Sequence, residues 1–191
     1  MVSEVLSGMV FGVSGELIKV QTDISDGLPV FTMIGYLSNE VREAKDRVRT
    51  ALKNCGFILP PRRISVNLAP ADFRKNGTYF DLAIAVSIFV SIGAVLEDKV
   101  KDTLFLGELA LDGKLTGLSG VLPIVKEALS RGCTRCMVPA DNADEAALLD
   151  GMEVYPFSHL GQVFDYLSGS IQTKRYERSS DKGADKEPAR S

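Results

Sequence analysis

The 191-residue chain contains a single histidine and three cysteines, and each scarcity argues against a class of site. A structural zinc site needs about four Cys or His ligands. The C-x-x-C of Cys133 and Cys136 has no second pair, so we expect both thiols to pack in the interior at the start of a strand. With His159 alone, the chain offers little for a Ser-His-Asp arrangement, and we interpret this histidine as a surface residue.

Motifs for nucleotide binding and hydrolysis are also missing. The chain has no G-x-x-x-x-G-K-[ST], the loop that cradles phosphates, and no G-x-S-x-G. Met1–Glu16 lacks the basic and apolar regions of a signal peptide. We therefore expect a cytoplasmic protein without a membrane partner and without a cofactor or metal bound by this chain.

The composition favours one globular domain. An apolar content of 45% is enough for a substantial core in a chain of this length. The net charge of −3 argues against strong nonspecific nucleic-acid binding by the whole domain but leaves room for a local basic patch.

The middle of the chain organises the rest. Ile64–Ala69 alternates apolar with polar or small residues, the period of a strand with one buried face. Pro70–Gly77 has turn composition, and Leu82–Ile92 is almost wholly apolar, which predicts a buried helix too short to cross a bilayer. Thr78 and Asp81 resemble a capping box that would begin this helix.

The flanking regions mix strand and helix patterns. Val2–Gly35 predicts a β-meander, and Ser38–Asn54 predicts an amphipathic helix capped by Ser38, with a solvated charged face. Further strands are expected at Leu104–Leu111, Lys114–Leu118, Arg135–Val138 and Met152–Tyr155, and helices near Pro123, from Asp141 or Asn142 to Leu149, and after a Ser158 cap. The predicted class is α+β (mixed α/β).

Composition divides the chain near residue 168. Residues 169–191 are rich in charge and poor in apolar side chains, so they cannot offset the entropy of ordering. We expect a folded domain over residues 1–168 and a disordered tail or linker over 169–191.

Four basic residues are the candidate contacts to DNA or to another subunit. Arg62 and Arg63 precede the Ile64 strand, and Arg74 and Lys75 follow it. Guanidinium and ammonium groups suit both phosphate and acidic protein surfaces. A strand of about seven residues would separate the pairs by roughly 20 Å unless the turn folds back. The alternative interpretation is that all four are ordinary solubilising charges at the strand ends.

Several blocks of sequence carry a family likeness. They are Arg63–Asp72, Arg74–Lys75, Gly77, Phe80–Ala85, Leu106–Gly113, Gly120–Pro123, Val138–Pro139, Asn142 and Glu145–Ala147. In this order they resemble the amino-terminal domain of the ComM/YifB family of magnesium chelatase-like (ChlI-domain) proteins. The resemblance implies a ribosomal protein S5 domain 2-like fold, as in Lon protease-like domains.

The resemblance also implies partners and a function. Family members continue through a linker into an AAA+ ATPase module that binds ATP and Mg, assemble as hexameric rings, and act on DNA in recombination and natural transformation. We expect this chain to be a non-catalytic accessory domain that aids ring assembly or DNA engagement. Its expected partners are the AAA+ module of the same protein, further copies in a homo-oligomer, and DNA.

Two alternatives use the same fold. Lon-like peptidases carry a Ser-Lys dyad, and alignment with their motifs places Phe80 near the serine and Leu122 near the lysine. Ser87 and Lys126 are close in sequence but do not fall at the matching positions, so a peptidase would be degenerate. An S5-like RNA-binding domain is disfavoured by the acidic balance and the lack of an aromatic-basic motif.

Overall fold

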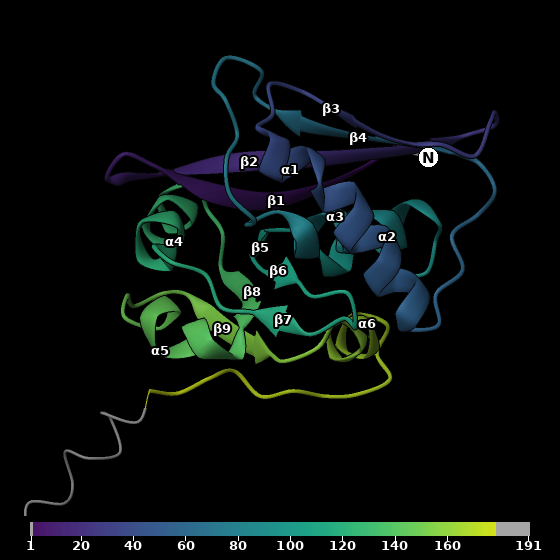
Figure 1. Ribbon diagram of the computed structural model, residues 1–191. Helices are drawn as coiled ribbons and strands as arrows, with labels where there is room; N and C mark the ends of the chain where they lie inside the picture. Colours follow the sequence, from purple (N-terminus) through teal and green to yellow (C-terminus); the bar gives the residue numbers. More distant parts are fainter. Residues whose placement is uncertain (1, 179–191) are drawn as a thin grey trace, which may run out of the picture.

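A seven-stranded mixed sheet of order β3-β4-β2-β1-β5-β8-β9 runs through the computed structural model, which describes residues 2–178 (Figure 1). Its strands are β1 (Val2–Phe11), β2 (Ser14–Ser25), β3 (Phe31–Ile34), β4 (Arg63–Ala69), β5 (Thr103–Phe105), β8 (Arg135–Pro139) and β9 (Glu153–Phe157). A separate two-stranded sheet pairs β6 (Glu108–Leu109) with β7 (Leu115–Thr116). The β1–β2 and β2–β4 pairs are antiparallel and the other pairs of the large sheet are parallel, which confirms the mixed class.

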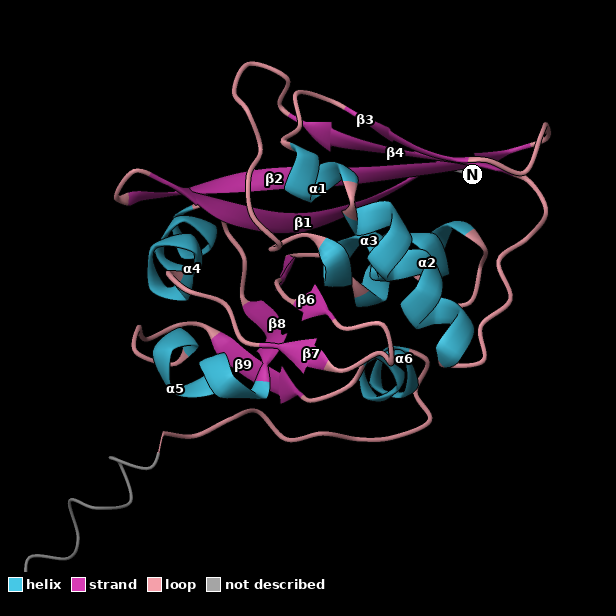
Figure 2. Cartoon of the chain, in the orientation of Figure 1, coloured by secondary structure: helices cyan, strands magenta, loops and turns pink. Residues whose placement is uncertain are grey.

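Helices cover both faces of this sheet (Figure 2). They are α1 (Asn39–Arg42), α2 (Ala44–Asn54), α3 (Asp81–Ser91), α4 (Val121–Ser130), α5 (Ala143–Ala146) and α6 (Leu160–Leu167), with 3-10 turns η1 (Glu97–Lys99) and η2 (Ala140–Asn142). The α2, α3 and α6 side chains share one core and those of α4 and α5 share the other. None of the helices within residues 2–178 combines the length and apolar character that a bilayer crossing requires.

The predicted β-meander is wrong in its third strand. The β1–β2 hairpin forms as expected. Phe11 pairs with Ser14, so the turn consists of Gly12 and Val13. The second edge of β2 is taken by β4 over a seven-residue register, and β3 pairs in parallel with the far side of β4. Strand β4, which is distant from β2 in the sequence, therefore lies between β2 and β3 in the sheet.

Helix α4 packs directly on the hairpin because two strand residues there have no side chain. A Cβ at Gly15 would lie 2.2 Å from the carbonyl oxygen of Pro123, and one at Gly8 would lie 2.3 Å from Cγ2 of Ile124. Pro123 occupies the first turn of α4, as its sequence position predicted.

Several predicted helix boundaries are corrected by tertiary contacts. The Ser38 cap is confirmed, since its Oγ accepts from the Val41 N–H at 3.2 Å, but the expected 38–54 helix is divided at Glu43. Helix α6 is capped by the ring Nδ1 of His159, which accepts from the Gly161 N–H, and not by Ser158. The predicted helix up to Leu149 is the short α5.

The capping box expected at the start of α3 does not form. Its N-cap is Phe80, which makes no side-chain cap bond. Thr78 Oγ1 donates instead to Glu108 at 3.2 Å, and the Asp81 carboxylate binds Arg47.

Part of the predicted tail lies against the domain. Within residues 169–178, which are described, the Tyr176 N–H donates to the Val154 carbonyl at 2.6 Å and the Tyr176 hydroxyl donates to Asp144. Residues 179–191 lie outside the described residues, so the division into domain and tail stays a prediction.

The buried helix is confirmed, because every residue of α3 from Asp81 to Val90 is buried. We expect Ile84→Ala or Ile88→Ala to lower the free energy of unfolding by about 2–5 kcal/mol, through lost transfer energy and a residual cavity. Lys53→Ala, on the exposed side of α2, should change it by less than about 0.5 kcal/mol. Urea unfolding of the three variants measures this, and a loss under about 1 kcal/mol at both isoleucines would contradict it.

Candidate functional site

The four basic candidates do not form one patch. Arg62 and Arg63 are exposed at the start of β4, and Arg74 is exposed beyond its end. Seven strand residues place the two ends of β4 about 20 Å apart. Lys75, in contrast, is fully buried.

Lys75 serves the fold, which corrects its assignment as a DNA or subunit contact. Its ammonium group donates to the Pro70 carbonyl and, at 3.0 Å, to the Phe73 carbonyl. Its backbone bonds Tyr36 and Ser38, so the loop after β4 is tied to the segment before α1. Burial lowers the pKa of Lys75, with Asp72 acting in the opposite direction. Nothing in the sequence distinguishes the buried Lys75 from its neighbour Arg74, which is exposed.

Removing the Lys75 ammonium should therefore destabilise the fold. We expect Lys75→Met to lower the free energy of unfolding by about 1–3 kcal/mol, because two loop carbonyls lose their donor. The matched substitution Arg74→Met, at the exposed neighbour, should have little effect. Equal stability of the two variants in chemical denaturation would refute the structural role of Lys75.

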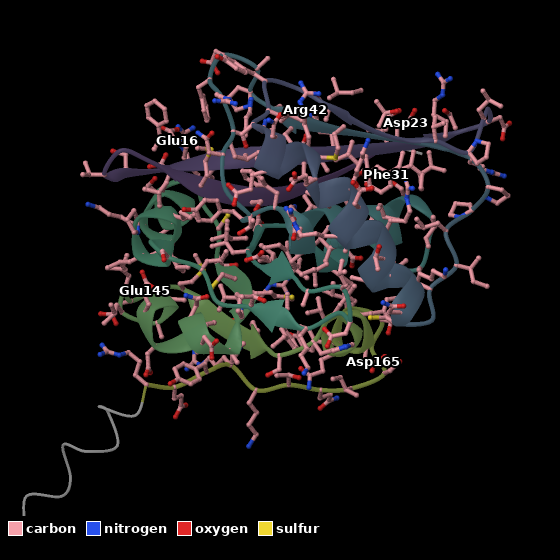
Figure 3. The ribbon with its side chains drawn as sticks, viewed as in Figure 1. Glu16, Asp23, Phe31, Arg42, Glu145 and Asp165 are labelled. Atoms are coloured by element: carbon pink, nitrogen blue, oxygen red, sulfur yellow. The ribbon has the colours of Figure 1, made fainter. Side chains whose placement is uncertain are left out.

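A groove that sequence reasoning missed lies between the β3 edge and α2. We call it the cationic groove; its volume is about 710 Å³. Its apolar walls come from Val30, Phe31 and the loop 57–61, and its charged groups are Arg49, Lys53 and Arg62. Phe31 lies beside α2 (Figure 3), with the Arg49 guanidinium 5.8 Å from its ring centre.

The charge of this groove has one sign. Among the described residues no acidic side chain lines it. Arg62 faces the exposed Asp26 at 3.7 Å, and Arg49 and Lys53 form no ion pair within residues 2–178. Arg49 and Lys53 belong to the helix face that the sequence presented as simply solvated. The available signal was the apolar run Phe57–Pro61 directly after that helix.

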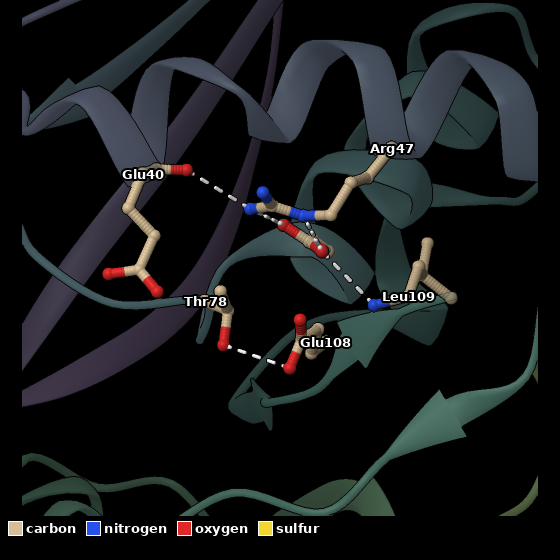
Figure 4. Close-up of polar contacts among 6 residues, drawn as sticks. Glu40, Arg47, Thr78, Glu108 and Leu109 are labelled. Atoms are coloured by element: carbon tan, nitrogen blue, oxygen red, sulfur yellow. Dashed lines mark hydrogen bonds and ion pairs between the residues drawn. The ribbon is translucent and has the colours of Figure 1, made fainter. Parts of the chain in front are cut away.

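A buried ionic cluster joins α2, α3 and β6 (Figure 4). Arg47 Nε donates to one Asp81 carboxylate oxygen at 2.8 Å and its Nη2 donates to the other at 3.0 Å. Asp81 also accepts from the Leu109 N–H at 3.0 Å, and Arg47 Nη2 donates to the Glu40 carbonyl. Because Arg47, Asp81 and the Leu109 N–H bond one another, the arrangement fixes α2 and α3 against β6.

Burial sets the protonation of this pair. It raises the pKa of Asp81 to about 6, although the hydrogen bond and charge of Arg47 act against the shift. Burial lowers the pKa of Arg47, but the Asp81 contacts outweigh it and the net shift is upward. The partners respond differently because Asp81 is fully enclosed, whereas Arg47 keeps 17% of its side chain exposed.

The raised pKa of Asp81 predicts that substituting Arg47 lowers the free energy of unfolding by an amount that depends on pH. The unfolded pKa of Asp is about 3.9, so the native state holds this proton more tightly, and the stability that Asp81 contributes falls as the pH rises from about 4 to 6. In Arg47→Met the pKa of Asp81 should rise further. The variant should lose about 3 kcal/mol at pH 8, where the carboxylate is left without its cation, and clearly less at pH 5.

Unfolding free energies at both pH values measure this difference, with Arg42→Met as the matched exposed control. A loss for Arg47→Met that is equal at pH 5 and pH 8 would show that Asp81 does not titrate in this range.

The positions aligned with a Lon-like dyad hold apolar side chains. Phe80 is buried, and Leu122 is half-buried with its N–H donating to Glu145 at 3.0 Å. Ser87 is enclosed in the core, where its hydroxyl bonds the Ile84 carbonyl and the Thr22 hydroxyl. Lys126 is exposed on α4, so the structure does not bring these two residues together as a nucleophile and base.

Cys133 and Cys136 lie in the core, and the ring of His159 contacts the backbone of a neighbouring turn. Cys133 and Cys136 are buried, as expected, and burial raises the pKa of both thiols, that of Cys136 to about 12. His159 is half-buried and not simply a surface residue, since its Nε2 lies 3.0 Å from the Asp112 carbonyl. Residues 2–178 contain no group of three or more His, Cys, Asp or Glu side chains placed to hold a metal ion.

The fold is that of a Lon-like domain, and the two positions aligned with the Ser-Lys dyad hold Phe80 and Leu122. Sequence comparison agrees at the level of the fold, because the Lon protease of Rhizobium meliloti is 27% identical over 165 residues, 79% of this chain and 20% of that protein. Residues 20–142 match the family model described as subunit ChlI of Mg-chelatase. The chain belongs to this magnesium chelatase-like family.

Relatives within the family confirm the predicted ComM/YifB likeness. The chain is 38% identical over 164 residues to the uncharacterized protein YifB of Escherichia coli, covering 86% of this chain and 32% of YifB. It is 39% identical over 158 residues to the competence protein ComM of Haemophilus influenzae, covering 83% of this chain and 31% of ComM. The chain thus spans about a third of the length of these relatives.

Proposed function

We propose that this chain is a non-catalytic accessory domain of a ComM/YifB-like AAA+ ATPase, and that it aids ring assembly or DNA engagement in recombination and natural transformation. The observation that carries the proposal is the family match over residues 20–142, together with similarity to a competence protein that is about three times longer. In this proposal ATP and Mg bind to the AAA+ module, and the domain itself acts in the cytoplasm by contact alone.

The arrangement of side chains supports contact in preference to chemistry. The aligned dyad positions hold Phe80 and Leu122, which supply neither nucleophile nor base. The buried acid Asp81 is occupied by Arg47 and the Leu109 N–H. These observations disfavour the degenerate Lon-like peptidase, and no described feature specifically favours it.

Three of the four original basic candidates stay available for DNA or subunit contact. Arg62, Arg63 and Arg74 are exposed, and their guanidinium groups suit phosphate as well as carboxylate. Because they lie at both ends of β4, each end would contact only one or two phosphates. Binding that neutralises so few phosphates is weak and depends on salt.

The corresponding test titrates labelled branched and duplex DNA into the chain and into the variant Arg62→Ala/Arg63→Ala/Arg74→Ala. Two to three phosphate contacts give a log-log salt slope of about −2 to −3, so binding near 50 mM salt should largely disappear by about 200 mM, and the variant should bind more weakly at both. The matched control Lys19→Ala/Arg42→Ala/Lys126→Ala removes three exposed charges elsewhere and should bind like wild type.

Light scattering on the same samples measures self-association. A chain that neither binds DNA nor associates with itself at high concentration would contradict the proposed function. A triple variant that matches wild type in both measurements would show that these arginines are only solubilising charges at the strand ends.

A further inference from the structure

The domain carries a second groove with the opposite charge. This acidic groove, of about 700 Å³, is lined by Glu4, Leu6, residues 96–98 and residues 100–102. Its charged groups are Glu4, Glu97, Asp98, Lys101 and Asp102, a formal charge of −3 from four acids and one lysine. The cationic groove has nearly the same volume and a formal charge of +3 from Arg49, Lys53 and Arg62. The charged groups that line the two grooves are therefore opposite in sign.

The strand-borne walls of the two grooves lie on opposite faces of the sheet. Phe31 and Ile64, which line the cationic groove, belong to the core beneath α2 and α3. On β1, Val5 points into that same core, so the alternation of a strand places Glu4 and Leu6 on the other face, where Leu6 packs with the α4 core. A contact between these grooves is therefore a contact between two molecules in a head-to-tail arrangement.

Each groove has an exposed apolar side chain at its margin. Ile58, in the wall of the cationic groove, is 90% exposed, and Leu96, in the wall of the acidic groove, is 67% exposed. Aliphatic side chains of this kind gain from entering an apolar concavity on another protein. Both grooves offer such a surface, Val30 in one and Leu6 in the other.

The charged groups of both grooves are largely unneutralised within the molecule. Within residues 2–178, no ion pair involves the acids Glu97, Asp98 and Asp102. The same holds for Arg49 and Lys53 of the cationic groove. Glu4 accepts a hydrogen bond from Gln21 at 3.0 Å, which leaves its charge in place. Although the chain has a net charge of −3, the opposite charges of the two grooves can attract one copy to another.

We propose that the cationic groove of one copy binds the acidic groove of a second copy. Ile58 enters the acidic groove and Leu96 enters the cationic groove, while Arg49 and Lys53 face the acids of the 96–102 segment. Such an interface is heterologous, and repeated rotation about it closes a ring or extends a filament. The inference rests on the proposed role in ring assembly and assigns the surfaces that perform it.

The chemistry of the cationic groove favours a protein occupant over single-stranded nucleic acid. Bases bind on exposed aromatic faces, and the large exposed side chains at this groove are the aliphatic Val30 and Ile58. The contact should be weak, because each pair of exposed charges contributes little to the free energy of association. Screening of its charges should also make it sensitive to salt.

The test measures self-association of the 191-residue chain by sedimentation equilibrium at about 50 mM and about 500 mM salt. We expect concentration-dependent association at the lower salt and its loss at the higher. Arg49→Glu/Lys53→Glu, which makes both grooves acidic, and Glu97→Lys/Asp98→Lys, which makes both basic, should each lower the association constant about ten-fold or more.

Mixing the two variants supplies the decisive control. Grooves of opposite charge then meet again, so the mixture should recover association that neither variant shows alone. Lys19→Glu/Arg42→Glu changes the net charge as much as the first variant but lies outside both grooves, and it should associate like wild type. Circular dichroism of each variant separates loss of association from loss of folding.

The outcomes separate this inference from the proposed function. If wild type associates but the groove variants associate equally well, or if the mixture shows no recovery, the groove pairing is wrong while a role in assembly survives. If Arg49→Glu/Lys53→Glu loses DNA binding without any change in self-association, nucleic acid is the occupant of the cationic groove and the pairing is again wrong. A chain that stays monomeric and binds no DNA overturns both.

Discussion

Helix α3 has no solvent-exposed side between Asp81 and Val90, so every polar group on it must be satisfied inside the protein. Asp81 meets this requirement through Arg47 of α2 and the Leu109 N–H of β6. Ser87 meets it on the other side through Thr22 of β2. The two polar residues thus fix α3 in rotation and depth, because turning it would leave a carboxylate or a hydroxyl buried without a partner.

On the opposite face of the sheet, β1 and β2 each carry a glycine where helix α4 packs. Gly8 and Gly15 let α4 approach the hairpin until the Pro123 backbone touches β2. The hairpin therefore contacts α3 through large apolar residues such as Val5 and Ile18. It contacts α4 through bare backbone at the two glycines, with Leu6 and Leu17 packed beside them. Of the two hairpin strands, β1 contributes Glu4 and Leu6 to the acidic groove, whereas the cationic groove is built on β3, α2 and the start of β4.

Local patterns predicted the elements with strong periodicity and failed where distant contacts decide. The strand Arg63–Ala69 and the helix α3 followed from alternation and from an apolar run. The position of β3 did not, because β2 pairs with the longer β4. The capping box at Thr78 and Asp81 failed for the same kind of reason, since Glu108 and Arg47 compete for these side chains from other elements. The family likeness, carried by ordered blocks, was recognisable before any contact was known.

Charge in the sequence was the weakest guide to the candidate site. Lys75 looked like the other three basic residues, yet it is enclosed and binds backbone carbonyls, while Arg49 and Lys53 looked like a solvated helix face and line a groove. These residues differ in the groups that the fold places around them. A cation beside apolar walls, without an acid on the same wall, has lost part of its hydration and gains more from a carboxylate or phosphate brought by a partner than an isolated surface charge does. The contact function that we propose for this domain is therefore best sought where apolar surface and unpaired charge coincide.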